Sequence, residues 1–214
     1  MIMPKKAGIV FVIAGAVLIL SALLLFSRNE IEDKQAEIAS QNALEDVQEA
    51  VSQPPEDEIP LEIILNEEEV YVAETEEAES AALPTVSIDG YEYVGYLSIP
   101  ALELELPVLA EVDEVRLKIA PCCQVGSPDT DDFVIAGHNY TSHFAKLYTL
   151  KYDDPIIFTD MDGNSYEYIV EKTETHDPNE ADAILNSGYP LVLYTCTYGS
   201  ENRTVVFCGR GGEE

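Results

Sequence analysis

The pattern of apolar and polar positions changes at two points along the chain, near residue 27 and near residue 87. The first segment, Ala7 to Phe26, contains twenty successive residues without a charge. As a helix, this segment covers about 30 Å, which matches the hydrocarbon thickness of a bilayer. The pattern therefore predicts a transmembrane anchor over residues 7–26.

The charges on either side of this segment predict its orientation. Lys5 and Lys6 precede it, whereas acidic residues follow it. Because basic residues are retained in the cytoplasm, we expect residues 1–6 to be cytoplasmic and the rest to lie outside the cell, anchored in the cell membrane by a single pass. A cleaved signal peptide is the alternative. The length of the apolar run, with no small-x-small site after it, favours an uncleaved anchor.

The second segment, residues 27–86, is strongly acidic. From Ser27 to Leu83 it holds eighteen acidic and two basic residues, and its apolar positions are scattered. Such a chain repels itself and buries too little apolar surface to offset its ordering entropy. We therefore expect an extracellular linker or stalk. A helix is expected over Glu30 to Val51, which is rich in good helix formers but lacks a broad apolar stripe.

From residue 87 to 212 the pattern indicates one all-β domain with short helices. The strand candidates are short runs of branched and aromatic residues: 91–99, 102–109, 133–136, 155–159, 165–173, 191–195 and 204–208. The helical patterns are brief: 112–119, 142–150, and 177–185 with Asp177 as a candidate cap. Many short strands with one- or two-turn helices predict a closed β-barrel with helices in its connections.

The charge and the cysteine content narrow the range of possible functions. The net charge of −30, with only 11 Lys and Arg residues, excludes a nucleic-acid-binding protein. The chain has four cysteines, Cys122, Cys123, Cys196 and Cys208. Disulfide bonds between them are permitted outside the cell but are not required. A bond from Cys208 to Cys122 or Cys123 is less favoured than free thiols. The Cys-Cys dipeptide lacks the C-x-x-C spacing of structural zinc sites, so no metal is expected.

Cys196 is the candidate nucleophile. It follows the apolar run 191–195 and precedes a polar turn, so we expect its thiol where a core strand reaches the surface. A buried structural cysteine is the alternative. His138 likewise ends an apolar strand, after Ala136 and Gly137. An imidazole beside a thiol can take its proton and later protonate a leaving amine, as acyl transfer requires.

Arg203 is the third candidate, because it opens the next strand seven residues after Cys196. A short hairpin would return its guanidinium to the sulfur, where it would stabilise a carbonyl oxygen that gains negative charge or hold the substrate backbone. A surface ion pair is the alternative. Arg210 is a second candidate with a looser position, while His143 and His176 are expected on the surface.

These segments together resemble the sortase family of cysteine transpeptidases. LYTC, which ends at Cys196 and precedes a turn and an Arg-led strand, is similar to the family's TLxTC signature. TDDFVIAGHNY resembles the histidine segment, and YVGYLSIPALELELPV resembles the opening strands. The order His, Cys, Arg also agrees over residues 91–210. The resemblance implies an eight-stranded sortase barrel as the catalytic domain over residues 87–212, on the surface of a Gram-positive bacterium.

The resemblance also implies a reaction. Cys196 would attack the Thr-Gly bond of an LPxTG-like sorting signal, carried by a surface protein or a pilin, and form a thioester. An amine of a peptidoglycan precursor or a pilin lysine would resolve it. His138 would act as acid and base, Arg203 would stabilise the oxyanion or hold the peptide, and Thr195 and Tyr194 would bind substrate. Family members use no organic cofactor, and calcium aids only some of them.

Two rival functions are considered. A cysteine protease would share the thioester but resolve it with water, and the order of His138 before Cys196 differs from that of papain-type proteases. A non-catalytic, membrane-anchored surface module would bind a partner and leave Cys196 structural. We expect the connection over residues 173–189 to select the substrate, because it is the longest connection near Cys196.

Overall fold

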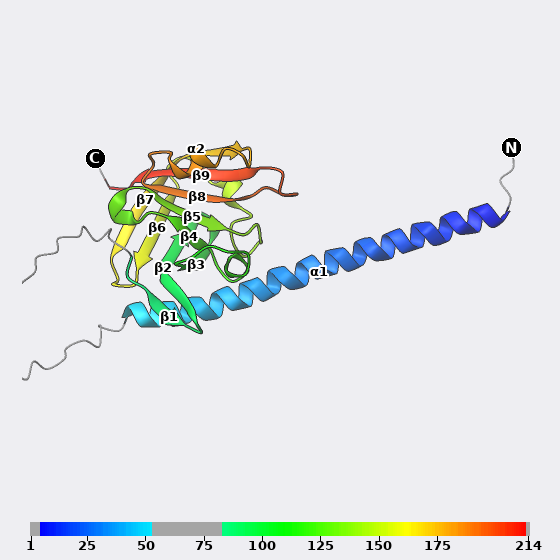
Figure 1. The fold of residues 1–214 in the computed structure, drawn as a ribbon, viewed down its shortest axis with the longest axis horizontal. Coiled ribbons are helices and arrows are strands. Elements are labelled where there is room, and N and C mark those ends of the chain that lie inside the picture. Colours follow the sequence, from blue (N-terminus) through cyan, green and yellow to red (C-terminus); the bar gives the residue numbers. More distant parts are fainter. Residues whose placement is uncertain (1–4, 53–82, 213–214) are drawn as a thin grey trace, which may run out of the picture.

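The computed structural model describes residues 5–52 and 83–212, without the side chains of residues 5–9. The helix α1 (Lys5–Ser52) comes first, and a β-barrel follows. The barrel lies beside the C-terminal part of α1, while the N-terminal part projects away from it (Figure 1). The site-bearing strands and the candidate membrane segment thus belong to two connected but distinct parts of the molecule.

The barrel strands are short, as the short runs of branched and aromatic residues predict. They are β1 (Val86–Ile88), β2 (Tyr91–Ile99), β3 (Leu104–Leu109), β4 (Cys122–Val125), β5 (Phe133–Gly137), β6 (Pro155–Asp160), β7 (Ser165–His176), β8 (Leu191–Cys196) and β9 (Arg203–Arg210). The connections contain α2 (Ala181–Leu185) and the 3₁₀ turns η1 (Pro100–Leu102), η2 (Arg116–Lys118), η3 (Pro128–Thr130) and η4 (Leu147–Thr149). All seven predicted strands are present. The prediction missed β1, which has three residues, and β4, whose Cys-Cys dipeptide shows no alternation.

Pairing between β2 and β6 closes the sheet. In the described residues the order is β2-β3-β4-β5-β8-β9-β7-β6, with β6 returning to β2, and β1 adds an edge to β2. The pairs β3–β4 and β5–β8 are parallel, and the other pairs are antiparallel. The closed eight-stranded barrel expected from the sequence is therefore confirmed, and closure removes the open edges that a flat sheet would expose.

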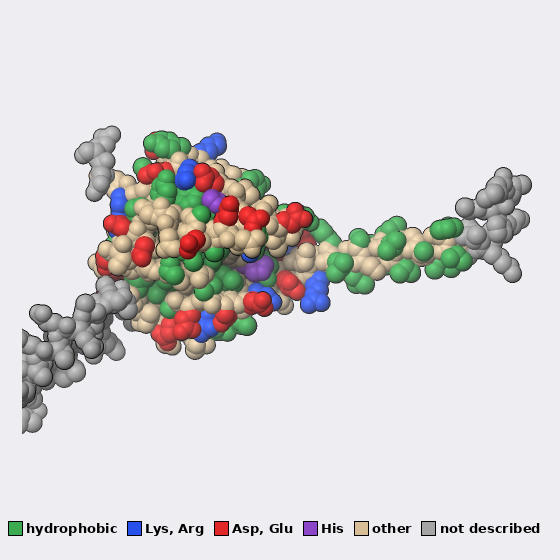
Figure 2. Space-filling model, turned by 45° about the horizontal axis from the view of Figure 1, so that its top comes forward, with side chains coloured by type: hydrophobic (Ala, Val, Ile, Leu, Met, Phe, Trp, Pro, Cys, Tyr) green, Lys and Arg blue, Asp and Glu red, His purple; other side chains and the backbone are tan. Residues whose placement is uncertain are grey.

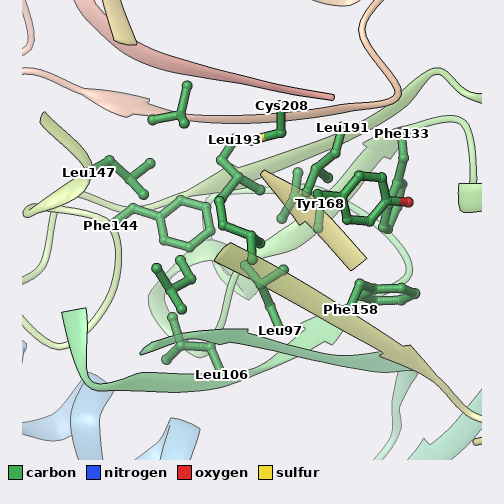
Figure 3. Packing of buried hydrophobic residues seen from close by; sticks show 14 of the residues in the cluster. Leu97, Leu106, Phe133, Phe144, Leu147, Phe158, Tyr168, Leu191, Leu193 and Cys208 are labelled. Carbon is green, nitrogen blue, oxygen red and sulfur yellow. The ribbon is translucent and has the colours of Figure 1, made fainter. Parts of the chain in front are cut away.

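The barrel interior is filled by one face of every main strand. Leu97, Phe133, Phe158 and Leu193 lie in this interior cluster and are fully buried. Figure 3 shows these side chains packed together, and Phe133 meets Phe158 edge to face at a centroid distance of 4.8 Å. Because successive side chains of a strand point to opposite faces of the sheet, the residues between these positions point out of the barrel. The candidate site lies at the ends of the strands.

The first part of α1 has the properties of a membrane span. Within the described residues α1 is the one helix long and apolar enough to cross a bilayer, and its most apolar window is not buried by the protein. Figure 2 shows apolar side chains around the projecting part of the helix. The predicted anchor, residues 7–26, lies inside α1.

The second part of α1 packs on the barrel, which corrects the expectation of a solvated linker over residues 27–52. Ala36, Ser40, Ala43 and Val47 are buried, and α1 contacts β1, β2 and β3. Their spacing of four, three and four residues places them on one helix face. The stripe is narrow and made mostly of small residues, so it is easily overlooked in an acidic sequence. Residues 53–82 of the predicted linker lie outside the described residues.

The predicted short helices form only in part. The candidates 112–119 and 142–150 contain turns and the 3₁₀ turns η2 and η4, and the third begins at Ala181 with Glu180 as its N-cap. Asp177 therefore does not cap α2 and instead accepts a hydrogen bond from the backbone N–H of Asn179 at 2.9 Å. Segments this short gain little from helix propensity, and burial of side chains such as Leu147 decides their conformation.

Candidate active site

The register of three adjacent strands brings the three predicted catalytic residues together. In the parallel pair β5–β8, Gly137 is opposite Thr195, so His138 and Cys196 are the next residues of the two chains. In the antiparallel pair β8–β9, Cys196 is opposite Arg203. His138, Cys196 and Arg203 therefore lie side by side at one end of β5, β8 and β9, although 65 residues separate the first from the last.

The alternation of β8 places Cys196 on the outer face of the barrel. Leu191 and Leu193 belong to the interior cluster, whereas Val192 packs outside it with Ile184 of α2. Cys196 follows Val192 by an even number of residues and shares its face. Cys196 is also partly exposed, so its sulfur is accessible at the end of an otherwise buried strand.

The neighbouring strands present their residues on this same outer face. Val134 of β5, and Val205 and Phe207 of β9, join the outer cluster. By the same alternation His138 and Arg203 face outwards, as Cys196 does. Val205 and Phe207 therefore share a side of β9 with Arg203, from which they are separated by even numbers of residues.

A tight hairpin between β8 and β9 places Arg203. Thr197 donates its backbone N–H to the carbonyl of Asn202 at 2.9 Å, and the N–H of Asn202 donates to the Thr197 hydroxyl at 3.1 Å. The Arg203 guanidinium donates to the Asn202 carbonyl at 3.2 Å. Tyr198 at the tip is 97% exposed. The hairpin thus keeps Arg203 opposite Cys196 in the sheet and presents an aromatic ring to solvent.

Two aromatic rings support His138. Gly137 allows the Phe144 ring to pack where a Cβ atom would stand, and the Phe144 N–H donates to the His138 carbonyl at 3.2 Å. The Tyr140 ring stacks on the imidazole at a centroid distance of 3.9 Å and an angle of 12°. Sequence analysis missed Tyr140, whose signal is an aromatic residue two positions after a candidate histidine.

The surroundings of His138 favour its neutral form. Burial lowers the pKa of the imidazole, and the nearby charge of Lys118 lowers it further, while Glu32 and Asp33 of α1 act in the opposite direction. Its Nδ1 atom is buried and has no hydrogen-bond partner in the described part of the chain. A neutral imidazole beside a thiol is ready to accept its proton.

The other two histidines are less exposed than predicted. His143 is fully buried between α1 and the barrel, and burial lowers its pKa to about 4. His176 is partly buried, with its imidazole nitrogens 3.2 Å from Glu174 and 3.1 Å from Glu180. The prediction of two surface residues is therefore wrong for His143, because α1 covers it.

Thr195 and Tyr194 lie on opposite faces of β8. The Thr195 side chain points into the barrel, is 2% exposed, and its hydroxyl has no partner among the described residues. Any contribution of Thr195 to an oxyanion site thus comes from its backbone. Tyr194 lies on the outer face with Cys196, where burial raises its pKa and its hydroxyl donates to Gln124 at 2.9 Å.

Arg210 lies at the opposite end of β9 from Arg203. Its guanidinium pairs with Asp131 at 2.7 Å and lies 5.2 Å from the Tyr168 ring centroid. These contacts give it a structural role and remove it as the alternative to Arg203.

All four cysteines lie in the described residues and are free thiols. Burial raises the pKa of Cys122 to about 12 and that of Cys123 to about 11, and it also raises the pKa of Cys208. Cys208 belongs to the interior cluster and Cys122 to the cluster beneath α1. These three thiols are held protonated, which leaves Cys196 as the candidate nucleophile.

Comparisons with known proteins identify the family and the fold of the chain. The sortase domain family matches residues 97–210, just over half of the chain. Sortase A of Bacillus anthracis is 27% identical over 140 residues, covering 62% of this chain and 66% of that protein, slightly less than two thirds of its length. Two solved structures share the fold. Sortase A from Corynebacterium diphtheriae has a TM-score of 0.50 and 25% identity over 58% of this chain and 63% of its own.

The second structure, sortase C1 from Streptococcus agalactiae, has a TM-score of 0.50 and 24% identity over 60% of this chain and 72% of its own. The region matched by the sortase domain begins in β2 and ends with β9. It therefore contains the strand ends that carry His138, Cys196 and Arg203. On this evidence the chain belongs to the sortase family.

Proposed function

We propose that this sortase is a membrane-anchored cysteine transpeptidase. It cleaves an LPxTG-like sorting signal between Thr and Gly and transfers the new acyl group to an amine. One observation carries this proposal: Cys196, His138 and Arg203 share one face at one end of three adjacent strands. A thiol, a base and a cation in such proximity are the groups that acyl transfer requires.

In the first half-reaction the Cys196 sulfur attacks the threonine carbonyl carbon while His138 takes the thiol proton. The carbonyl oxygen becomes negatively charged, and the Arg203 guanidinium stabilises it. The C–N bond then breaks, and His138 returns its proton to the leaving glycine amine. The product is a threonyl thioester on Cys196.

In the second half-reaction an amine attacks the thioester carbonyl. His138 takes a proton from this amine, the C–S bond breaks, and the proton passes to the sulfur, which regenerates the free thiol. The new bond is an amide, so the transfer needs no external energy source and no cofactor. We expect the amine to come from a peptidoglycan precursor or a pilin lysine.

The connection between β7 and β8 is the proposed region of substrate selection. It begins after His176, which is opposite Arg203 in the β7–β9 pair. Lys172 lies 4.4 Å from the Phe207 ring centroid and 5.4 Å from that of Tyr189, and these rings are 5.0 Å apart. This cation–aromatic cluster joins the connection to the outer face of β9. The end of the connection is thereby held against the outer face of β9, the strand that begins at Arg203.

The proposed location is the outer surface of the cell membrane. The apolar run at the start of α1 spans the bilayer, and Lys5 and Lys6 hold its N-terminal end in the cytoplasm. The barrel then lies outside, where surface proteins, pilins and cell-wall precursors are found. A membrane-bound enzyme is well placed to receive substrates that are themselves held at the membrane.

The test uses the full-length protein in detergent, kept reduced, with fluorogenic LPxTG-type peptides and a glycine peptide as the amine. We expect amine-dependent product and a threonyl adduct on Cys196 by mass spectrometry. Cys196→Ala, His138→Ala and Arg203→Ala should each lower the rate by about 100-fold or more without unfolding the protein. Cys123→Ala, which changes a thiol elsewhere in the barrel, is the matched control.

The two rivals predict different results. Resolution of the thioester by water alone, with no transfer to any amine, would identify a cysteine protease. No adduct and no cleavage from folded, reduced protein would contradict the proposal and favour a surface binding module. Normal turnover by any one of the three alanine variants would remove that residue from its role.

A further inference from the structure

The juxtamembrane part of α1 contacts the loop that follows His138. We call residues 139–143 the histidine loop. The Asp33 carboxylate of α1 accepts hydrogen bonds from the Ser142 hydroxyl at 3.2 Å and from the Ser142 N–H at 3.5 Å. These bonds join residues 109 apart in sequence. They connect α1 to the loop that carries the aromatic support of His138.

Further contacts continue from this anchoring point to the imidazole. His143, which follows Ser142, is fully buried, and its ring meets the Tyr140 ring edge to face at 5.5 Å. Tyr140 in turn stacks on His138 at 3.9 Å. The backbone supports the same arrangement, because the His143 N–H donates to the Tyr140 carbonyl at 3.0 Å. A displacement of the loop at Ser142 would therefore move the ring that packs on His138.

The charges around His138 give α1 an electrostatic role as well. Glu32 and Asp33 of α1 raise the imidazole pKa, whereas Lys118, the last residue of η2, lowers it. The other titratable and charged groups near the imidazole are Tyr140 and His143 of the loop and Cys196 and Arg203 of the neighbouring strands. The two carboxylates thus offset part of the effect of burial and strengthen His138 as a base.

We propose that Asp33 is a positioning residue of the active site, holding the histidine loop and supplying negative charge beside His138. This inference rests on the proposed function and extends the active site to the membrane helix. Asp33 lies seven residues after Phe26, about 10 Å along a helix. The same helix that anchors the enzyme therefore supports its base close to the bilayer.

The test separates the hydrogen bond from the charge in the full-length protein. Asp33→Asn keeps a carbonyl acceptor for Ser142 but removes the charge, and Ser142→Ala removes the hydroxyl but keeps the charge. Glu45→Gln, an exposed position further along α1, is the control for charge. The measurements are kcat/KM against pH in the peptide assay, and the rate of Cys196 alkylation by iodoacetamide against pH.

We expect Asp33→Asn to lower kcat by about tenfold with KM little changed, because His138 is a weaker base without the nearby negative charge. In both pH profiles, the limb that reflects the titration of His138 should move to lower pH. Asp33→Glu should restore part of the shift. Ser142→Ala should lower kcat without moving that limb, and Glu45→Gln should behave as the unmodified enzyme.

The inference and the proposed function fail in different ways. If the unmodified enzyme forms the thioester but Asp33→Asn matches Glu45→Gln in rate and pH profile, the role of Asp33 is wrong. A loss of activity accompanied only by lower thermal stability, with no shift in pH, overturns it as well. If the enzyme forms no thioester, the proposed function fails, and the alkylation profile still decides whether Asp33 acts on His138.

Discussion

Gly137 helps to set the position of the candidate base because it has no side chain. A Cβ atom there would overlap the Phe144 ring, which lies in the interior cluster beside Leu147 (Figure 3). The Phe144 N–H also donates to the His138 carbonyl. The close approach of Gly137 and Phe144 therefore helps to fix the end of β5 and, with it, the position of His138.

Gly137→Ala is expected to lower both activity and stability. The added methyl must displace the Phe144 ring, and overpacking of this kind costs about 2 kcal/mol. A shift of His138 should lower kcat/KM by about tenfold or more. Thermal unfolding and peptide turnover measure the two effects. Adding Phe144→Leu should recover stability relative to the sum of the single changes, and strict additivity would show that the two residues do not clash.

His143 predicts a pH-dependent loss of stability. Its pKa is about 4 in the folded chain and 6.5 as the ordinary value. Between these values the unfolded chain binds the proton and the folded chain does not, so stability falls as the pH drops from 6.5 to 4. The loss is about 3 kcal/mol in all, at 1.4 kcal/mol per pH unit.

Urea unfolding of unmodified protein and of His143→Gln over this pH range measures the effect. Many carboxylates also titrate here, so the difference between the two proteins isolates the histidine. The variant should lose less stability towards acid. Parallel curves for the two proteins would mean that His143 does not remain neutral in the folded chain.

At the scale of elements, α1 has two environments along one continuous helix. Its first part exposes large apolar side chains such as Leu18 and Leu24, at 71% each, while Val47 near its end is fully buried against the barrel. The small residues Ala36 and Ala43 allow the helix to approach β1, β2 and β3 closely. The helix thus combines a candidate membrane span with a packed structural element.

Val47→Asp tests this packing. A carboxylate at a fully buried position has no water, so the substitution should destabilise the barrel by about 3 kcal/mol or more. Ile38→Asp is the matched control, because Ile38 is 59% exposed on the same helix. Thermal unfolding in detergent compares the two. Equal melting temperatures would show that α1 does not pack on the barrel through this face.

At the scale of the whole molecule, the candidate membrane segment projects away from the barrel that carries the candidate site (Figure 1). The barrel lies against one side of the C-terminal part of α1 (Figure 1). Acidic side chains are spread over the barrel surface (Figure 2), in agreement with the net charge of −30. This acidity does not attract the protein to anionic lipid headgroups, so the proposed attachment to the membrane depends on the helix.

The proposed orientation predicts which thiol is accessible from outside. A membrane-impermeant maleimide applied to intact cells should label Cys196, and the Cys196→Ala protein should take up little reagent because the other thiols have raised pKa values. An N-terminal tag should stay protected from external protease. Labelling of Cys196 only after the cells are opened would reverse the orientation.

Much of the fold and site could be predicted from local patterns. Short runs of apolar, branched and aromatic residues predicted the strands β2, β5 and β8, and the strand-end settings of Cys196 and His138 predicted the candidate nucleophile and base. The outward direction of Arg203 also agrees with the alternation of side chains along β9. Tyr140, His143 and Asp33 could not be recognised, because their importance depends on contacts with residues far away in the sequence.

The sequence by itself determined the features that depend on neighbouring residues. Twenty uncharged residues indicate a membrane segment in any context, and short alternating runs indicate half-buried strands. Only the tertiary structure decided that β2 pairs with β6, that Thr195 faces inwards and that residues 36–47 of α1 pack on the barrel. These features arise from pairing and packing between distant segments. Local periodicity cannot specify them, because each is favourable only when its distant partner is already in place.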